Sequence, residues 1–383
     1  METGKEWRDS QSGTAVSTFG IMYGQPIALG DYDIYVKYVL TGSPMYGAGV
    51  RRGWRLEKIG VYEVSSLIET EEGIETLYDE MEKMMNDYVF VDPMGNIHEM
   101  QVQASTFTTS TCLDWRIFTS EDYPGLNHKV GYFNYRSFVA PLVGDITKVF
   151  ASFKAEGVGD LILDLRYNGG GSTEALDTLV GLLVPEKLDG DIFSVLTHNS
   201  NLSDLDEKSR YSVSDHTLSL NRIFIIIGNG TASASEVLIN GLRSGIGVSN
   251  VITVGEVTFG KPNGMYVFAY PQGPDSDYYS KADYVFLPIC FYTCNKDGEQ
   301  IPDYGFVPSH SVPDDLYHDW GVDERLINDC LTYITKGHFL PDTEVTKCGN
   351  MCSGRKGLQI IREENAPGYG KLYRETSGMK KKF

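Results

Sequence analysis

The sequence has 383 residues, of which 41% are hydrophobic and 12% aromatic, so it can bury more than one globular core. The formal net charge of −19 argues against nucleic acid as a partner, because the phosphates would be repelled. Every apolar run is too short to span a membrane, and residues 1–18 are too polar and charged to form a signal peptide.

The first 108 residues predict a flexible start followed by a small β-rich domain. Residues 1–15 lack a regular pattern, whereas strand patterns and one helical pattern of period 3.6 follow from residue 16. A Gly-Ser-Pro turn interrupts the strands. The predicted strands cover residues 19–24, 34–40, 88–91 and 100–102, and the predicted helix covers residues 74–84.

Residues 16–108 resemble a PDZ domain. Such domains bind extended peptides by adding a strand to a sheet edge, and they hold a terminal carboxylate in a loop of amides. The matching loop here is 17–21, so the resemblance implies Phe19, Gly20 and Ile21 as peptide-binding residues. A module that only packs against its neighbour is the alternative.

The region after residue 108 alternates strand and helix patterns. Residues 105–111 are rich in Ser and Thr and are expected to be a linker. Buried strands are predicted at 161–165, 222–227 and 251–254, and amphipathic helices at 145–155, 173–183 and 323–334. This alternation favours an α/β core. The predicted catalytic domain spans 109–340, and residues 341–383 form an extension.

Three short blocks carry the candidate chemistry. A Ser-Ala-Ser-Glu block, 233–236, lies between an apolar strand pattern and a helical pattern, so Ser233 is expected at a helix N-terminus. Unpaired amides and the helix dipole stabilise an anion there. A Gly-Gly-Gly turn, 169–171, precedes this block, and a Thr-Phe-Gly-Lys block, 258–261, follows it.

In this order the blocks resemble the S41 peptidases, the carboxy-terminal processing or tail-specific protease family. The resemblance implies a crotonase/ClpP-like layered fold beside the PDZ-like domain. It also implies a Ser-Lys dyad in which Ser233 is the nucleophile and Lys261 the general base. Many family members place a glutamine four residues after the lysine, whereas this chain has Met265.

The dyad imposes two physical requirements. Lys261 must lose its proton, which burial in an apolar pocket favours, and Val257 and Phe259 are expected as the walls of that pocket. An oxyanion hole needs two converging amides. The amide of Ala234 is one candidate, and that of Gly170 or Gly171 is the other. Glu236 is expected to cap the helix.

The predicted function is a serine endopeptidase of unstructured or C-terminal peptide segments, without metal or other cofactor. Two alternatives stay open, a catalytically silent peptide-binding protein and a crotonase-like acyl-CoA enzyme. If the protein belongs to the bacterial cell envelope, as the family implies, its targeting segment has been removed. The partners would be proteins or peptides. The six cysteines settle neither compartment nor pairing, although Cys348 and Cys352 could form a disulfide.

Overall fold

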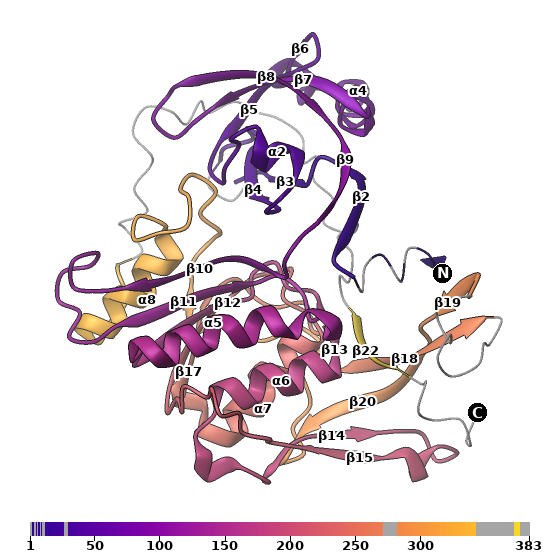
Figure 1. Cartoon of the computed structure of the whole chain (residues 1–383), viewed down its shortest axis with the longest axis vertical. Coiled ribbons are helices and arrows are strands. Elements are labelled where there is room, and N and C mark those ends of the chain that lie inside the picture. Colours follow the sequence, from indigo (N-terminus) through magenta and orange to yellow (C-terminus); the bar gives the residue numbers. More distant parts are fainter. Residues whose placement is uncertain are drawn as a thin grey trace. The chain divides into compact units, whose positions relative to one another are not determined.

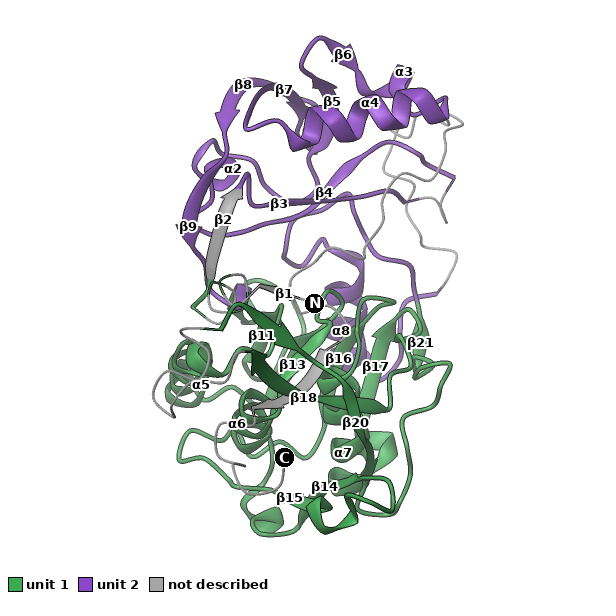
Figure 2. Cartoon of the chain, turned by 90° about the vertical axis from the view of Figure 1, so that its right-hand side faces the viewer, with its two compact units in different colours: residues 1–13, 114–311, 364–383 green, residues 14–113, 312–363 purple. Residues whose placement is uncertain are grey.

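The computed structural model describes residues 5, 7, 9, 12–13, 18–26, 30–270 and 282–341, and the backbone of 2–3, 14–17 and 371–375. The chain forms two compact units, which Figure 2 colours separately. Unit 1 comprises residues 1–13, 114–311 and 364–383, and unit 2 comprises residues 14–113 and 312–363. The α/β fold class is confirmed. Within the described ranges, none of the helices has both the length and the apolar character that crossing a membrane requires.

A largely parallel sheet forms the centre of unit 1. Its strand order is β10-β11-β12-β16-β17-β21, and β11 through β21 run parallel to one another. The inner strands consist of buried, mostly apolar residues, as expected for a sheet covered on both faces. The strands are β10 (Cys112–Phe118), β11 (Val130–Tyr135), β12 (Asp160–Asp164), β16 (Ile223–Ile227), β17 (Val251–Gly255) and β21 (His310–Ser311).

Three helices pack beside this sheet: α5 (Val143–Glu156), α6 (Thr173–Leu183) and α7 (Ala234–Ile246). Helix α7 contacts β17 on one side and β14 and β20 of a second sheet on the other. The second sheet has the order β1-β19-β18-β20-β14-β15, and β22 joins it by pairing with both β13 and β18 (Figure 1). A helix layer therefore separates two sheets.

The second sheet combines short and long strands. They are β1 (Glu2–Thr3), β13 (Gly170–Ser172), β14 (Ile192–Thr197), β15 (Glu207–Arg210), β18 (Asn263–Tyr270), β19 (Tyr284–Phe286), β20 (Ile289–Asn295) and β22 (Lys371–Glu375). Short 3₁₀ turns lie at Ala140–Leu142, Glu186–Leu188, Ser203–Leu205 and Val248–Asn250.

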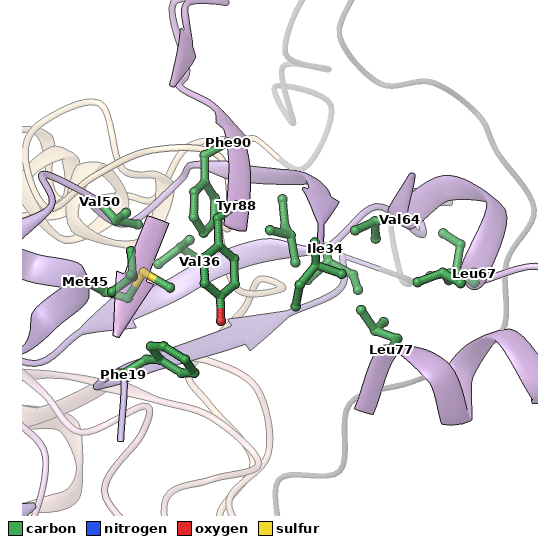
Figure 3. Close-up of a cluster of buried hydrophobic side chains, with 14 of the residues drawn as sticks. Phe19, Ile34, Val36, Met45, Val50, Val64, Leu67, Leu77, Tyr88 and Phe90 are labelled. Atoms are coloured by element: carbon green, nitrogen blue, oxygen red, sulfur yellow. The ribbon is translucent and has the colours of Figure 1, made fainter. Parts of the chain in front are cut away.

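Unit 2 has its own sheet and its own core. The sheet order is β3-β4-β5-β7-β8, with β6 paired to β5. Figure 3 shows the apolar cluster beneath it, where Met45, Ile34 and Phe90 are completely buried. The elements are β3 (Ile21–Gly24), β4 (Tyr35–Val39), α2 (Pro44–Gly47), β5 (Arg55–Ile59), β6 (Tyr62–Glu63), α3 (Val64–Leu67), α4 (Glu71–Glu82), β7 (Met85–Val91) and β8 (Ile97–Gln103).

Two predictions about organisation need correction. The expected linker contains strand β9 (Ser105–Thr108), which pairs with β2 (Thr14–Thr18). Helix α8 (Arg325–Lys336) belongs to unit 2, whereas the sequence analysis placed it in the 109–340 domain. The buried Arg52 explains this, because its guanidinium donates to Asp314 at 3.0 Å. Most of 1–15 and 341–383, including Cys348 and Cys352, lies outside the described residues.

Candidate active site

Ser233 stands where strand β16 ends and helix α7 begins. Its backbone has φ 61° and ψ −114°, a conformation that residues with a side chain rarely adopt. Strain of this kind persists only where surrounding contacts impose it, and it is frequent at catalytic sites. The structure thus contains the predicted strand, turn and helix, and the turn is strained at the candidate nucleophile.

The segment that follows β12 holds this turn in place. Thr231 Oγ1 donates to the carbonyl of Leu165 at 2.7 Å. The carbonyl of Asn168 accepts from Ala232 N at 3.1 Å and from Ser235 Oγ at 3.0 Å. Asn168 is fully buried. These contacts from two neighbouring strand ends impose the backbone conformation of the serine turn.

The Ser233 hydroxyl is buried, and across the described part of the chain its Oγ has no hydrogen-bond partner. The turn nevertheless has the arrangement of a capping box, in which the Ser233 side chain faces the backbone N–H of Glu236 without forming a well-aligned hydrogen bond. The hydroxyl therefore lies at a helix N-terminus without a strong partner of its own.

The Glu236 carboxylate joins the serine turn to the lysine block. Its Oε2 accepts from the backbone N–H groups of Ser233 at 2.8 Å and Lys261 at 2.9 Å. Its Oε1 accepts from Thr258 Oγ1 at 2.6 Å and from Gly260 N at 2.7 Å. The side chain is completely buried. The capping role expected of Glu236 covers its bond to Ser233 N, whereas its bonds to residues 258–261 could not be read from the sequence.

Lys261 is half-buried on a loop that is anchored twice. Glu236 binds its amide, and Phe259 N donates to the carbonyl of Thr231 at 2.9 Å. The expected apolar walls are not buried, since Val257 is 40% exposed and Phe259 51% exposed. Their role as walls around the Lys261 amine stays a prediction. The pairing of the Ser233 hydroxyl with the Lys261 amine stays a prediction.

The structure favours one of the two glycines that could supply an amide to the oxyanion hole. Gly170 N already donates to Asn168 Oδ1 at 2.9 Å. Gly170 and Gly171 have φ of 102° and 142°, so both positions favour glycine. A side chain at Gly171 would also collide with the carbonyl of Phe138. Gly171 is therefore the better candidate from this turn, to act with the amide of Ala234.

His128 lies at the opposite end of the parallel strands from Ser233, so it cannot serve as the base in place of Lys261. Its Nε2 is 2.7 Å from Asp160 Oδ2, and Asp160 is the first residue of β12. Ser233 follows the last residue of β16, which runs parallel to β12. The two residues therefore lie at opposite ends of the strands. Among the described residues, no group of three or more His, Cys, Asp or Glu side chains is placed to hold a metal ion.

The predicted peptide loop of unit 2 precedes β3, which stands at one end of its sheet. Phe19 is buried in the core, and its carbonyl accepts from Met45 N at 3.2 Å. Gly20 has φ 70°, and a side chain there would collide with Ser43. Ile21 begins β3 and is half-buried. The PDZ assignment and the peptide-binding role of this loop stay predictions.

The segment that contains this site is similar to a known protein family. Residues 129–287, which include Gly170, Gly171, Ser233 and Lys261, match the model of peptidase family S41. This part of the chain is therefore similar to the S41 peptidases. It is similar to a putative S41 protease from Bacteroides fragilis NCTC 9343, with a TM-score of 0.66 and 19% identity over 83% of this chain and 82% of that one. This likeness concerns the fold.

Two curated relatives are named as processing enzymes. The chloroplastic C-terminal processing peptidase of Tetradesmus obliquus is 25% identical over 241 residues, covering 60% of this chain and 48% of that protein. The carboxy-terminal processing protease CtpA of Bacillus subtilis (strain 168) is 27% identical over 147 residues, covering 38% of this chain and 29% of that protein. The match thus spans less than half the length of either relative.

Proposed function

We propose that this chain is a serine-type endopeptidase that cleaves extended peptide segments. Ser233 Oγ attacks the carbonyl carbon of the scissile bond while Lys261 Nζ takes the hydroxyl proton. The amides of Gly171 and Ala234 bind the oxyanion. Lys261 then passes the proton to the leaving amine, and water hydrolyses the acyl-enzyme through the same base. No metal or cofactor takes part in these steps.

The observation that carries the proposal is the double attachment of Glu236. One carboxylate oxygen accepts from the amides of both Ser233 and Lys261. The backbone amides of Ser233 and Lys261, which are separated by 27 residues in the sequence, are thereby held by the same oxygen atom. A catalytically silent binding protein or an acyl-CoA enzyme has no need to bring a strained serine and a lysine together in this way.

The substrate class and the location follow from the relatives. Both curated relatives are named as C-terminal processing enzymes, one of them from a chloroplast and one from a bacterium. We therefore propose protein or peptide substrates with accessible ends and a place in the cell envelope. The PDZ-like loop at Phe19, Gly20 and Ile21 would deliver the peptide.

The test is covalent labelling with a fluorophosphonate probe, read by mass spectrometry. We expect a single adduct on Ser233, no adduct in Ser233→Ala, and labelling at least 100-fold slower in Lys261→Ala. Ser244→Ala is the control, because this serine lies on the same helix and its hydroxyl bonds only within it, to Gly241 O at 3.0 Å. Undiminished labelling of the Lys261 variant would exclude the dyad, and an adduct that persists in Ser233→Ala would exclude Ser233 as the nucleophile.

A further inference from the structure

The segment 371–375 forms a strand between two elements of the candidate active site. Strand β22 (Lys371–Glu375) pairs in parallel with β13, placing Leu372 opposite Gly171. It also pairs in parallel with β18, placing Tyr373 opposite Met265. Figure 1 shows β22 between these strands. One neighbour contains the candidate oxyanion glycine, and the other begins two residues after Lys261.

The hydrogen bonds of β13 show which of its edges faces this segment. Phe138 N donates to Gly170 O at 3.0 Å, and Ser172 N donates to Phe138 O at 2.8 Å. In a parallel ladder, alternate residues bond to opposite sides. The N–H and C=O of Gly171 therefore point away from Phe138 and toward 371–375. A peptide strand in this position would lie directly against the candidate oxyanion donor.

The burial of the nucleophile indicates a closed state. Ser233 and Ala234 have no exposed surface, and Gly170 and Gly171 are buried. A scissile peptide bond must reach both the hydroxyl and the amides, so part of the chain has to move before a substrate can react. The segment that already pairs with β13 is the one whose position a substrate strand would take.

We propose that the slot between β13 and β18 is the binding site for the extended substrate, and that residues 371–375 occupy it as an internal competitor. The proposal rests on the proposed peptidase function and specifies how its substrate binds. Main-chain pairing on both edges accepts many sequences, as strand addition does elsewhere. A tethered segment competes at an effective concentration of about millimolar, so a free peptide binds weakly until the segment leaves.

The experiment uses Tyr373→Pro in the full chain, with Ser233→Ala added so that nothing is cleaved. Tyr373 is opposite both Ser172 and Met265, so proline removes a ladder donor and disfavours the strand. Tyr373→Ala is the matched control, because it keeps the amide. The probe is a fluorescent peptide with the sequence of residues 368–378, and the same peptide with proline at the position of Tyr373 is its control.

We expect the probe to bind the proline variant at least tenfold more tightly than the alanine variant, measured by fluorescence anisotropy. Hydrogen exchange at 170–172 and 265–267 should be at least tenfold faster in the proline variant and slow again when the probe is added. Equal affinity for both variants, or unchanged exchange in these strands, would overturn the proposal. Replacing 371–375 by Gly-Ser-Gly-Ser-Gly supplies a second release variant if the proline variant does not fold.

This design separates the inference from the peptidase proposal. Binding and exchange need no nucleophile, so they test the slot even if fluorophosphonate labelling of Ser233 fails. If labelling succeeds but the release variants bind no probe, Ser233 is reactive and the slot is not the substrate site. In the catalytically intact chain, the Tyr373→Pro change should also speed labelling of Ser233 at least tenfold.

Discussion

At the scale of single residues, Glu236 shows how one side chain can connect the two segments that carry the candidate catalytic residues. Its two oxygens accept four hydrogen bonds. One oxygen accepts from the amides of Ser233 and Lys261, and the other accepts from Thr258 Oγ1 and Gly260 N. All four partners are donors, so the site requires an acceptor at both oxygen positions. We assign Glu236 a positioning role.

The substitution Glu236→Gln tests this role. Glutamine replaces one acceptor oxygen by an NH₂ group, which then faces two donors and leaves them unpaired. We expect the free energy of unfolding to fall by about 1–3 kcal/mol for each donor left unpaired. We also expect Ser233 labelling to slow by at least 100-fold at temperatures where the variant remains folded. Circular dichroism and labelling kinetics measure the two effects.

Glu324→Gln is the matched control for a buried capping carboxylate. Glu324 is completely buried and accepts from Ile327 N at 2.9 Å, but it belongs to unit 2. Its substitution should lower stability without changing the labelling rate of the folded protein. A Glu236→Gln protein that is destabilised yet labelled at the parent rate would assign Glu236 to the fold alone.

Local patterns located the turn that carries Ser233 but not the surroundings of the candidate residues. The Ser-Ala-Ser-Glu block places Ser233 correctly, because a strand pattern followed by a helix pattern defines the turn between them. The partners of Glu236 are more than 20 positions away, and no local rule relates them. The exposure of Val257 and Phe259 was missed for the same reason, since apolar residues in a loop are buried only if another element covers them.

At the scale of elements, strand β13 depends on the absence of a side chain at Gly171. A Cβ atom there would collide with the carbonyl of Phe138, and φ of 142° is strained for other residues. Gly171→Ala should therefore displace β13 and lower the rate of Ser233 labelling at least 100-fold. The stability loss should exceed 1 kcal/mol, because both backbone strain and a backbone collision are introduced.

Gly144→Ala is the control for this prediction. Gly144 lies in helix α5, and a side chain built there meets nothing within 4 Å. Alanine should be neutral or stabilise the helix by up to about 1 kcal/mol. Thermal unfolding and labelling kinetics compare the two variants. Equal labelling rates in both would show that Gly171 has no part in the reaction.

The turn before helix α8 predicts a pH dependence of stability. His318 Nδ1 is 2.8 Å from Asp315 Oδ2, and this hydrogen bond raises the pKa of His318 against the opposing effect of burial. Charges of Glu324 and Asp323 raise it further. Because the pKa of His318 is higher in the folded state, protonation of His318 stabilises the folded protein. This stabilisation is complete at pH values below the pKa of the unfolded state, about 6.5, and is lost as the pH rises through the pKa of the folded state.

The substitution His318→Gln should therefore lower the free energy of unfolding more at pH 5.5 than at pH 9. The difference should be about 0.2–1 kcal/mol, since the pair is partly exposed. Burial alone would raise the pKa of Asp315, but the hydrogen bonds from His318 and from neighbouring amides outweigh it and lower the pKa. Asp315 therefore stays ionised throughout this pH range. Urea unfolding at the two pH values measures the effect. A cost of His318→Gln that stays constant between the two pH values would refute the linkage.

Element types were predicted well where burial is periodic, and poorly where strands are polar. Helix α6 has the predicted bounds, 173–183, because one face of a regular helix is buried. Strand β9 was taken for a linker because its Ser and Thr residues are mostly exposed, and its pairing with β2 lies about 90 positions away in the sequence. Strand β15 is likewise polar and was not predicted.

At the scale of the whole molecule, unit 2 is assembled from two distant parts of the sequence. Residues 14–113 supply its sheet, and residues from 312 onward return to it after the whole of the parallel sheet has been built. Residues 312–340 were expected in the catalytic domain, because helical periodicity shows that one face of a helix is buried but not which element covers it. The buried side chain of Arg52 shows that residues from 312 onward pack against the first part of unit 2.

Arg52 connects the two parts of unit 2. Its side chain is 1% exposed, and its guanidinium donates to Lys37 O at 2.6 Å, contacts Asp314 and lies 4.1 Å from the ring of Trp320. Arg52→Leu leaves Asp314 without this cation and the Glu324 carboxylate buried beside an apolar side chain. Removing one partner of a buried ion pair costs about 3–5 kcal/mol, so unit 2 should unfold first.

Hydrogen exchange measures whether this loss is confined to unit 2. In Arg52→Leu, exchange in β5 and β7 should accelerate by at least 100-fold, while exchange in β12 and β16 of unit 1 should be unchanged. Arg51→Leu is the neighbouring control and should cost less than about 1 kcal/mol, because Arg51 is only partly buried and has no carboxylate partner among the ion pairs of the described residues. If Arg52→Leu accelerated exchange equally in both units, the two would unfold together, and residues 312–341 could not be assigned to one of them on energetic grounds.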